Sequence, residues 1–170
     1  ATEPLILLTE QSNFWSDFRY GLDLLSHRVV KINGMYAATG AFFRSAYRGS
    51  GIVLSETCEF YGKNGHVDTS MADGLLAGGA KAVMGYVNNV YSVYSRSMLW
   101  DMVNRMIAGD TLEQAAEDAK ETYGTDDIIW YSSQGGRRPH AAASYLMLSG
   151  DHTVRLPGAP AAAPAEQQAA

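Results

Sequence analysis

The chain of 170 residues is 46% hydrophobic and 18% charged, which is enough for one globular domain with a hydrophobic core. Its 18 acidic and 13 basic residues give a net charge of −5, which argues against nucleic acid as a partner because phosphate binding needs a basic surface. A single cysteine, Cys58, excludes an internal disulfide and a zinc site built from several thiolates. No apolar run approaches the roughly 20 residues of a membrane-spanning helix.

In the first third of the chain, two short runs of strand length flank one segment of helical periodicity. The runs are residues 4–8 and residues 29–32, and the second stops at Asn33-Gly34. Between them, a helix is expected to begin at Ser12 or Asn13. Its apolar residues recur at helical spacing: Phe14, Phe18, Leu22 and Leu25.

The middle of the chain repeats this alternation. A short helix through residues 42–47 precedes a third strand at 52–54, and Cys58 follows the end of that strand. After a glycine-containing loop, a helix begins at Thr69 or Ser70 and leads into a fourth strand at 81–87.

Two helices and two further strands are expected after residue 87. The first helix ends at Gly109 and carries a stripe of side chains that we expect in the core: Val90, Tyr94, Met98, Met102 and Met106. Thr111-Leu-Glu-Gln114 has the capping-box pattern and predicts the start of the second helix. Residues 128–131 and 144–148 complete six predicted strands.

Apolar strands that alternate with helices indicate an α/β domain over residues 3–156. We expect three layers, α-β-α, around a mostly parallel six-strand sheet with Cys58 at its carboxyl edge. Residues 157–170, PGAPAAAPAEQQAA, hold no large apolar side chain and are predicted to form a flexible Ala/Pro-rich tail.

Common cofactor and hydrolase motifs are absent from the sequence. There is no G-x-G-x-x-G after a strand, no G-x-x-x-x-G-K-[ST] and no G-x-S-x-G. His66 and Asp68 share one loop, but two ligands are too few to define a metal site. We therefore expect no cofactor and no metal.

Three segments in order carry a family pattern. Residues 51–62 place Cys58 after a strand and before a glycine-containing loop, and residues 69–87 form a helix that passes through Gly78-Gly79-Ala80 into a strand. Residues 145–156 are similar to a terminal Leu-x-Gly-Asp-Pro-x-x-Arg-Leu strand. Together they resemble the caspase-fold clan of cysteine peptidases, nearest to its gingipain-like and CHAT-like bacterial branches. The resemblance implies a caspase-like fold and a nucleophilic cysteine at Cys58.

The resemblance also implies a catalytic dyad, and one member of it is missing. The family's histidine lies in a His-Gly pair at the end of the preceding strand, where this chain has Asn33-Gly34. An asparagine amide cannot take a proton from a thiol at neutral pH. In gingipain-like domains, the loop after the fourth strand helps to form the pocket for the residue before the scissile bond. The matching substrate-binding candidates here are Tyr86, Asn88, Asn89 and Tyr91, although Asn88 to Tyr91 could instead cap the next helix.

Three hypotheses follow, all with a protein or peptide as partner. In the first, the domain has lost its dyad and serves as a protein-binding or assembly module. In the second, it is an active cysteine peptidase in which His66 is a substitute base for Cys58 and backbone N–H groups near Gly34 stabilise the oxyanion. In the third, the chain is a processed fragment, and a partner supplies the histidine. The start at Ala1-Thr2-Glu3-Pro4 favours a secreted or periplasmic protein, with a cytoplasmic location left open.

Overall fold

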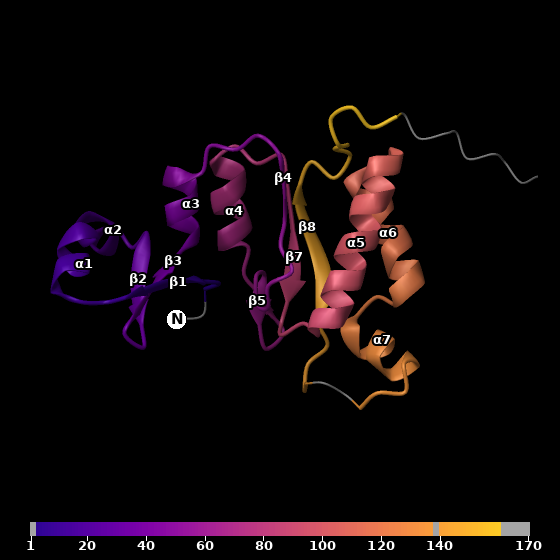
Figure 1. Ribbon diagram of the computed structural model, residues 1–170, viewed down its shortest axis with the longest axis horizontal. Helices are drawn as coiled ribbons and strands as arrows, with labels where there is room; N and C mark the ends of the chain where they lie inside the picture. Colours follow the sequence, from indigo (N-terminus) through magenta and orange to yellow (C-terminus); the bar gives the residue numbers. More distant parts are fainter. Residues whose placement is uncertain (1–2, 138–139, 161–170) are drawn as a thin grey trace, which may run out of the picture.

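Three small sheets organise the chain in the computed structural model, which describes residues 3–137 and 140–160 (Figure 1). The N-terminal sheet is antiparallel, in the order β1-β3-β2, with β1 (Ile6–Gln11), β2 (Val29–Ile32) and β3 (Met35–Ala38). In the central sheet, β7 (Ala82–Val87) pairs in parallel with β4 (Ile52–Leu54) and antiparallel with β8 (Tyr145–Gly150). β5 (Gly62–Lys63) and β6 (His66–Val67) form a short hairpin. The predicted mostly parallel six-strand sheet is therefore wrong.

Two local features explain the difference. Asn33 and Gly34 have positive φ angles of 51° and 76°, so they form a two-residue turn that joins β2 to an unforeseen antiparallel strand, β3. Residues 128–131 belong to a helix, α7 (Asp127–Ser133), because the Asp126 side chain accepts hydrogen bonds from the N–H groups of Ile128 and Ile129. A short apolar run alone cannot distinguish a strand from a buried helix.

The helices predicted from the sequence are confirmed in position. They are α1 (Phe14–Arg19), α2 (Gly21–Leu25), α3 (Gly40–Ala46), α4 (Ser70–Ala77), α5 (Ser92–Ala108) and α6 (Leu112–Tyr123). The expected single helix after Asn13 is divided at Tyr20 into α1 and α2. The predicted capping box at the start of α6 is confirmed, because Thr111 and Gln114 each accept a hydrogen bond from the other's backbone N–H.

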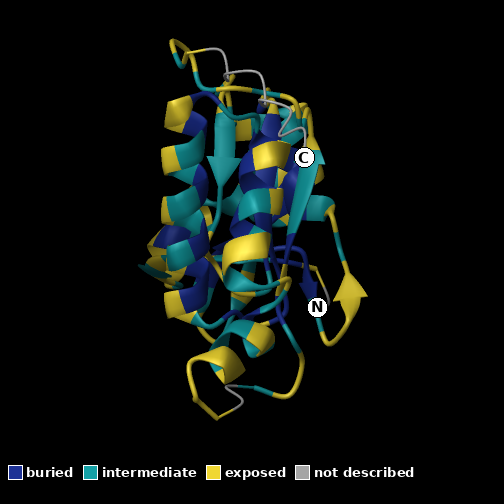
Figure 2. Cartoon of the chain, turned by 90° about the vertical axis from the view of Figure 1, so that its right-hand side faces the viewer, coloured by how far each residue is buried: buried dark blue, intermediate teal, exposed yellow. Residues whose placement is uncertain are grey.

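The core lies on the two faces of β7, all six of whose residues are buried. Met84 and Tyr86 pack in one cluster with residues of α5 and α6, whereas Val83 and Val87 pack in a second cluster with residues of α4. The predicted burial of the methionine stripe is confirmed, since Met98, Met102 and Met106 are fully buried. Exposed residues of the helices lie on their outer sides (Figure 2).

A pair of glycines lets α3 and α4 approach closely. A Cβ atom on Gly40 would overlap the carbonyl of Ser70, and one on Gly74 would overlap the carbonyl of Gly40. Since α3 directly follows β3, this contact joins the N-terminal sheet to the rest of the molecule.

The end of the described chain carries no helix or strand. Residues 157–160 are irregular, and residues 161–170 of the predicted tail lie outside the described residues. Within the part of the chain that the structure describes, no helix has both the length and the apolar character required to cross a membrane.

Candidate functional site

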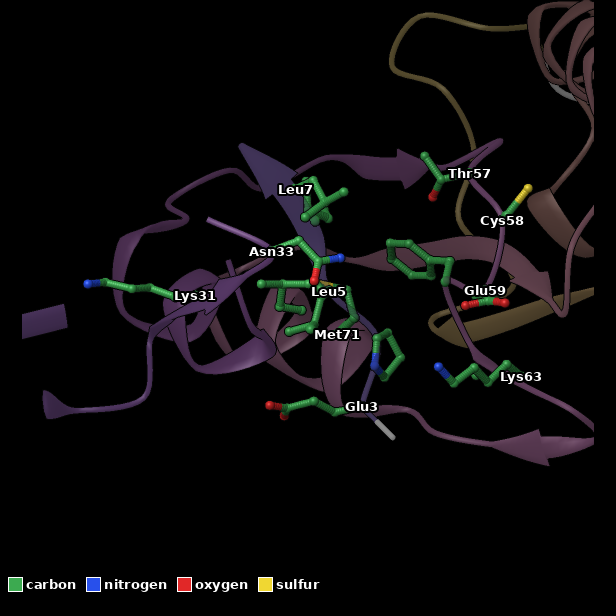
Figure 3. Close-up of a pocket in the computed structure, with 15 residues that line it drawn as sticks. Glu3, Leu5, Leu7, Lys31, Asn33, Thr57, Cys58, Glu59, Lys63 and Met71 are labelled. Carbon is green, nitrogen blue, oxygen red and sulfur yellow. The ribbon is translucent and has the colours of Figure 1, made fainter. Parts of the chain in front are cut away.

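An open pocket of about 860 Å³ lies between the N-terminal sheet and the loop after β4 (Figure 3). Its walls come from β1 and the residues before it (3–7), from the end of β2 and the turn that follows (31–33), from the loop after β4 (57–60), from β5 (62–63) and from Met71 of α4. We call it the Cys58 pocket. Among the described residues that line it, two are acidic, Glu3 and Glu59, and two are basic, Lys31 and Lys63, so these charges balance.

Cys58 lies at the rim of this pocket, four residues beyond the end of β4. Its side chain is exposed, and the thiol donates a hydrogen bond to the carbonyl of Val90, with 3.7 Å between Sγ and O. In Figure 3 the sulfur points away from Asn33 and Leu5 on the opposite wall. The thiol is therefore accessible, but its observed partner is a backbone carbonyl and not a base.

Asn33, at the position where the resemblance places the family's histidine, lines the same pocket as Cys58. Gly34 completes the β2–β3 turn, and its carbonyl accepts a hydrogen bond from the N–H of Ser12. Gly34 itself is not among the residues that line the pocket. A role of its N–H group as an oxyanion donor for Cys58 has no support in this geometry.

His66 lies on the β5–β6 hairpin, where it pairs with Lys63 across the Asn64-Gly65 turn. It is exposed, and it does not line the Cys58 pocket. The structure describes no contact between the imidazole and the Cys58 thiol. His66 is only eight residues from Cys58 in sequence, but it belongs to the hairpin and pairs there with Lys63.

The four substrate-binding candidates serve different roles and lie outside the pocket lining. Tyr86 is fully buried on β7 and its hydroxyl has no hydrogen-bond partner among the described residues; burial raises the pKa of this phenol above its ordinary value. Tyr91 stacks edge-on with Tyr131, at 4.5 Å between ring centroids. Asn89 is exposed. Of the four, Tyr86 is a core residue and cannot touch a ligand in this conformation.

Asn88 joins the segments around the pocket. It is 5% exposed with a positive φ of 66°, and its backbone bonds to residues 59 and 62. Its side-chain oxygen accepts a hydrogen bond from the N–H of Gly65, and its side-chain nitrogen donates to the carbonyl of Ala143. Asn88 therefore fixes the loop that carries Cys58 and the β5–β6 hairpin against the segment that precedes β8, which is a structural role.

A buried carboxylate beside this region was not foreseen from the sequence. Asp127 is fully buried and accepts hydrogen bonds from the N–H groups of Tyr91 and Ser144, and His140 Nε2 lies 2.7 Å from its Oδ2. The Val90 carbonyl and the Tyr91 N–H belong to one trans peptide group and point in opposite directions. This peptide group therefore separates the Cys58 thiol from the Asp127 carboxylate.

Among residues 3–137 and 140–160, no group of three or more His, Cys, Asp or Glu side chains is arranged to hold a metal ion. No protein-family model matches the chain, and comparisons with curated proteins and with solved structures find no match either.

Proposed function

We propose that this chain is a peptide- or protein-binding module without peptidase activity, and that the Cys58 pocket receives an extended segment of a partner protein. The observation that carries the proposal is the composition of the pocket: it joins an edge strand, β1, to an accessible cysteine, and no histidine is among the described residues that line it. The resemblance of residues 51–62 to a cysteine-peptidase segment supports a peptide as the ligand.

The position of β1 supports binding by strand addition. β1 is at the edge of the N-terminal sheet and pairs only with β3 in the described ladder. An extended peptide can hydrogen-bond to the free edge of such a strand while its side chains enter neighbouring hollows. Apolar side chains are available beside this edge, from Leu5, Leu7 and Phe60.

The surroundings of the thiol support the absence of catalysis. Proton transfer needs a base within about 3 Å of the thiol, directly or through one water molecule. The described partner of Sγ is the Val90 carbonyl, His66 lies outside the pocket, and His140 contacts Asp127. Loss of general acid–base catalysis costs on the order of 100-fold or more in rate.

The binding test uses an immobilised library of extended peptides, followed by fluorescence anisotropy with the best sequences. Leu7 is 58% exposed and lines the pocket, so Leu7→Asp should weaken binding by about 10-fold or more without affecting folding. Ile129 is 52% exposed on α7 and does not line the pocket, so Ile129→Asp is the matched control and should bind like the wild type. Equal binding by both variants would contradict a site at β1.

The catalytic test uses fluorogenic peptide mixtures and an electrophilic peptide probe with the wild type, Cys58→Ala and His66→Ala. We expect no turnover above the level of Cys58→Ala. Turnover that disappears in both variants would establish the alternative, a cysteine peptidase with His66 as the base.

A further inference from the structure

The helix pair α1–α2 exposes an apolar face to solvent. Its five large side chains are each more than three-quarters exposed: Phe14 76%, Trp15 77%, Phe18 82%, Leu22 77% and Leu25 81%. We call this set the α1–α2 apolar face. The helix pair lies at the end of the molecule farthest from α5 and α6 (Figure 1), and none of the residues that the structure describes covers the apolar face.

The polar side of the helix pair is the side that packs on the N-terminal sheet. Ser16 is buried and accepts a hydrogen bond from the Tyr36 hydroxyl, which also lies 2.6 Å from a carboxylate oxygen of Asp17. The Tyr20 hydroxyl donates to Glu10 on β1. An amphipathic helix on a protein surface normally turns its apolar stripe toward the core. This inverted orientation leaves five large apolar side chains exposed to water, which is unfavourable.

The exposed area is comparable with one side of a protein interface. Three aromatic and two leucine side chains at this exposure present roughly 600–700 Å² of apolar surface. That exceeds the patch of a few hundred Å² found on most monomers and approaches the ~800 Å² that each partner contributes to a standard interface. Aromatic residues are also the side chains that most often carry binding energy in such contacts.

The charges around the face favour a second copy of the chain over a membrane. Asp17 pairs with Lys31, and Asp23 pairs with Arg28 at 2.7 Å, so these carboxylates are neutralised within the chain. Two copies can therefore meet without strong like-charge repulsion. Helices that lie on membranes carry a polar face rich in Lys and Arg, whereas α1 and α2 carry two acids, Asp17 and Asp23, and one base, Arg19.

We propose that the α1–α2 apolar face is the contact surface of a symmetric homodimer. A two-fold contact places this face of one chain on the same face of the other and buries both at once. Homodimer interfaces are more apolar than other interfaces, in agreement with a centre that consists of Phe, Trp and Leu. The proposal is independent of the Cys58 pocket and of any ligand bound there.

Sedimentation velocity of the wild-type chain over a concentration series up to about 100 µM tests the proposal, and the expected species has twice the mass of one chain. The double substitution Phe18→Asp with Leu22→Asp should weaken self-association by about 100-fold or more. Both side chains are exposed, so the circular dichroism spectrum of the monomeric variant should be unchanged. Trp100 is 64% exposed on α5, and Trp100→Asp is the matched control that should still dimerise.

Three outcomes would overturn the proposal. The first is a wild type that stays monomeric throughout the series, a result that depends on no variant. The second is a dimer that the double substitution leaves intact while Trp100→Asp abolishes it. The third is a monomer that binds vesicles containing anionic lipid through α1 and α2, which would assign the face to a membrane.

Discussion

On α5, Met98, Met102 and Met106 are fully buried against the central sheet, whereas Phe18 and Leu22 on α1 and α2 are 82% and 77% exposed. Both sets recur at helical spacing, and both segments are helices. The spacing determines which side chains share a face of a helix. Whether that face is buried depends on what lies beside it, and the two regions differ in this respect.

The neighbouring sheet accounts for the difference. α5 follows β7, and β7 presents Met84 and Tyr86 to the same cluster as the α5 methionines. In the N-terminal sheet, by contrast, the Tyr36 hydroxyl donates a hydrogen bond to Ser16 of α1, and Glu10 accepts one from the hydroxyl of Tyr20, which lies between α1 and α2. These hydrogen bonds hold the polar side of the helix pair against the sheet, so its apolar side faces outward.

The largest expected effect is on the buried stripe. Met102→Ala removes a fully buried side chain and should lower the free energy of unfolding by about 2–5 kcal/mol, measured by urea denaturation. The matched variant Phe18→Ala should change it by less than about 0.5 kcal/mol in dilute solution, where dimerisation contributes little. Equal losses would mean that the α1–α2 apolar face is buried within one chain.

The second-largest expected effect is a loss of folding stability at alkaline pH, which comes from the central region. Burial raises the pKa of Tyr61 from 10.0 to about 12, and its hydroxyl contacts Ser149 and the Val83 carbonyl. The neutral phenol is therefore favoured in the folded state, so its contribution is complete below pH 10 and is lost as the pH rises toward 12. The expected slope from this group is up to about 1.4 kcal/mol per pH unit.

Urea midpoints on both sides of pH 10 measure this slope. Tyr61→Phe should flatten it without abolishing it, since burial also raises the pKa of Tyr86 and Tyr94. An unchanged slope in Tyr61→Phe would show that Tyr61 does not titrate in the folded protein.

Two glycine-to-alanine substitutions compare how much space the backbone has in the two regions. Gly74→Ala places a methyl group against the Gly40 carbonyl and should cost about 1–3 kcal/mol. Gly21 in α2 has no atom within 4 Å of an added Cβ, so Gly21→Ala should stabilise the protein by up to about 1 kcal/mol. Thermal melts of both variants test the prediction, and destabilisation by Gly21→Ala would reveal a neighbour of α2.

The smallest effect concerns an exposed ion pair in the N-terminal region. A hydrogen bond from Lys31, together with one from Tyr36, lowers the pKa of Asp17 below 3.8. The stabilisation by this carboxylate is thus present above pH 3.8 and is lost as the pH falls through the lowered value. Lys31→Met should raise the pKa of Asp17, as measured by NMR titration; no change would mean that Tyr36 alone holds it low.

The sequence was most informative where local chemistry decides the structure. The capping box at Thr111 and Gln114 predicts α6, and the apolar run 81–87 predicts the strand that the structure has at Ala82–Val87. The resemblance assigns Tyr86 on this strand to a substrate pocket, whereas the structure buries it in the core. The apolar run 128–131 predicts a strand, and the feature that identifies it as a helix is the N-cap at Asp126.

The candidate site was less predictable because its parts come from distant segments. Residues 3–7 reach Cys58 only through the path of the N-terminal sheet, and no spacing rule encodes that path. The partners of Asp127 are likewise distant in sequence, since Tyr91 precedes it by a whole pair of helices. An Asp-Asp pair before an apolar run signals an N-cap, but not which of the two carboxylates is buried.

The pairing of β7 with β8 has a consequence for the order of folding. Val87 pairs with Tyr145 across a stretch that contains α5, α6 and α7, whereas Ile32 and Met35 are joined by two residues. Closure of a long loop is entropically costly and slows the formation of distant contacts. We therefore expect the β2–β3 hairpin to form early and β8 to join the central sheet late, because its pairing with β7 closes the longer loop. A refolding chain in which β8 has not yet paired would leave one edge of β7 open, and an open strand edge favours aggregation.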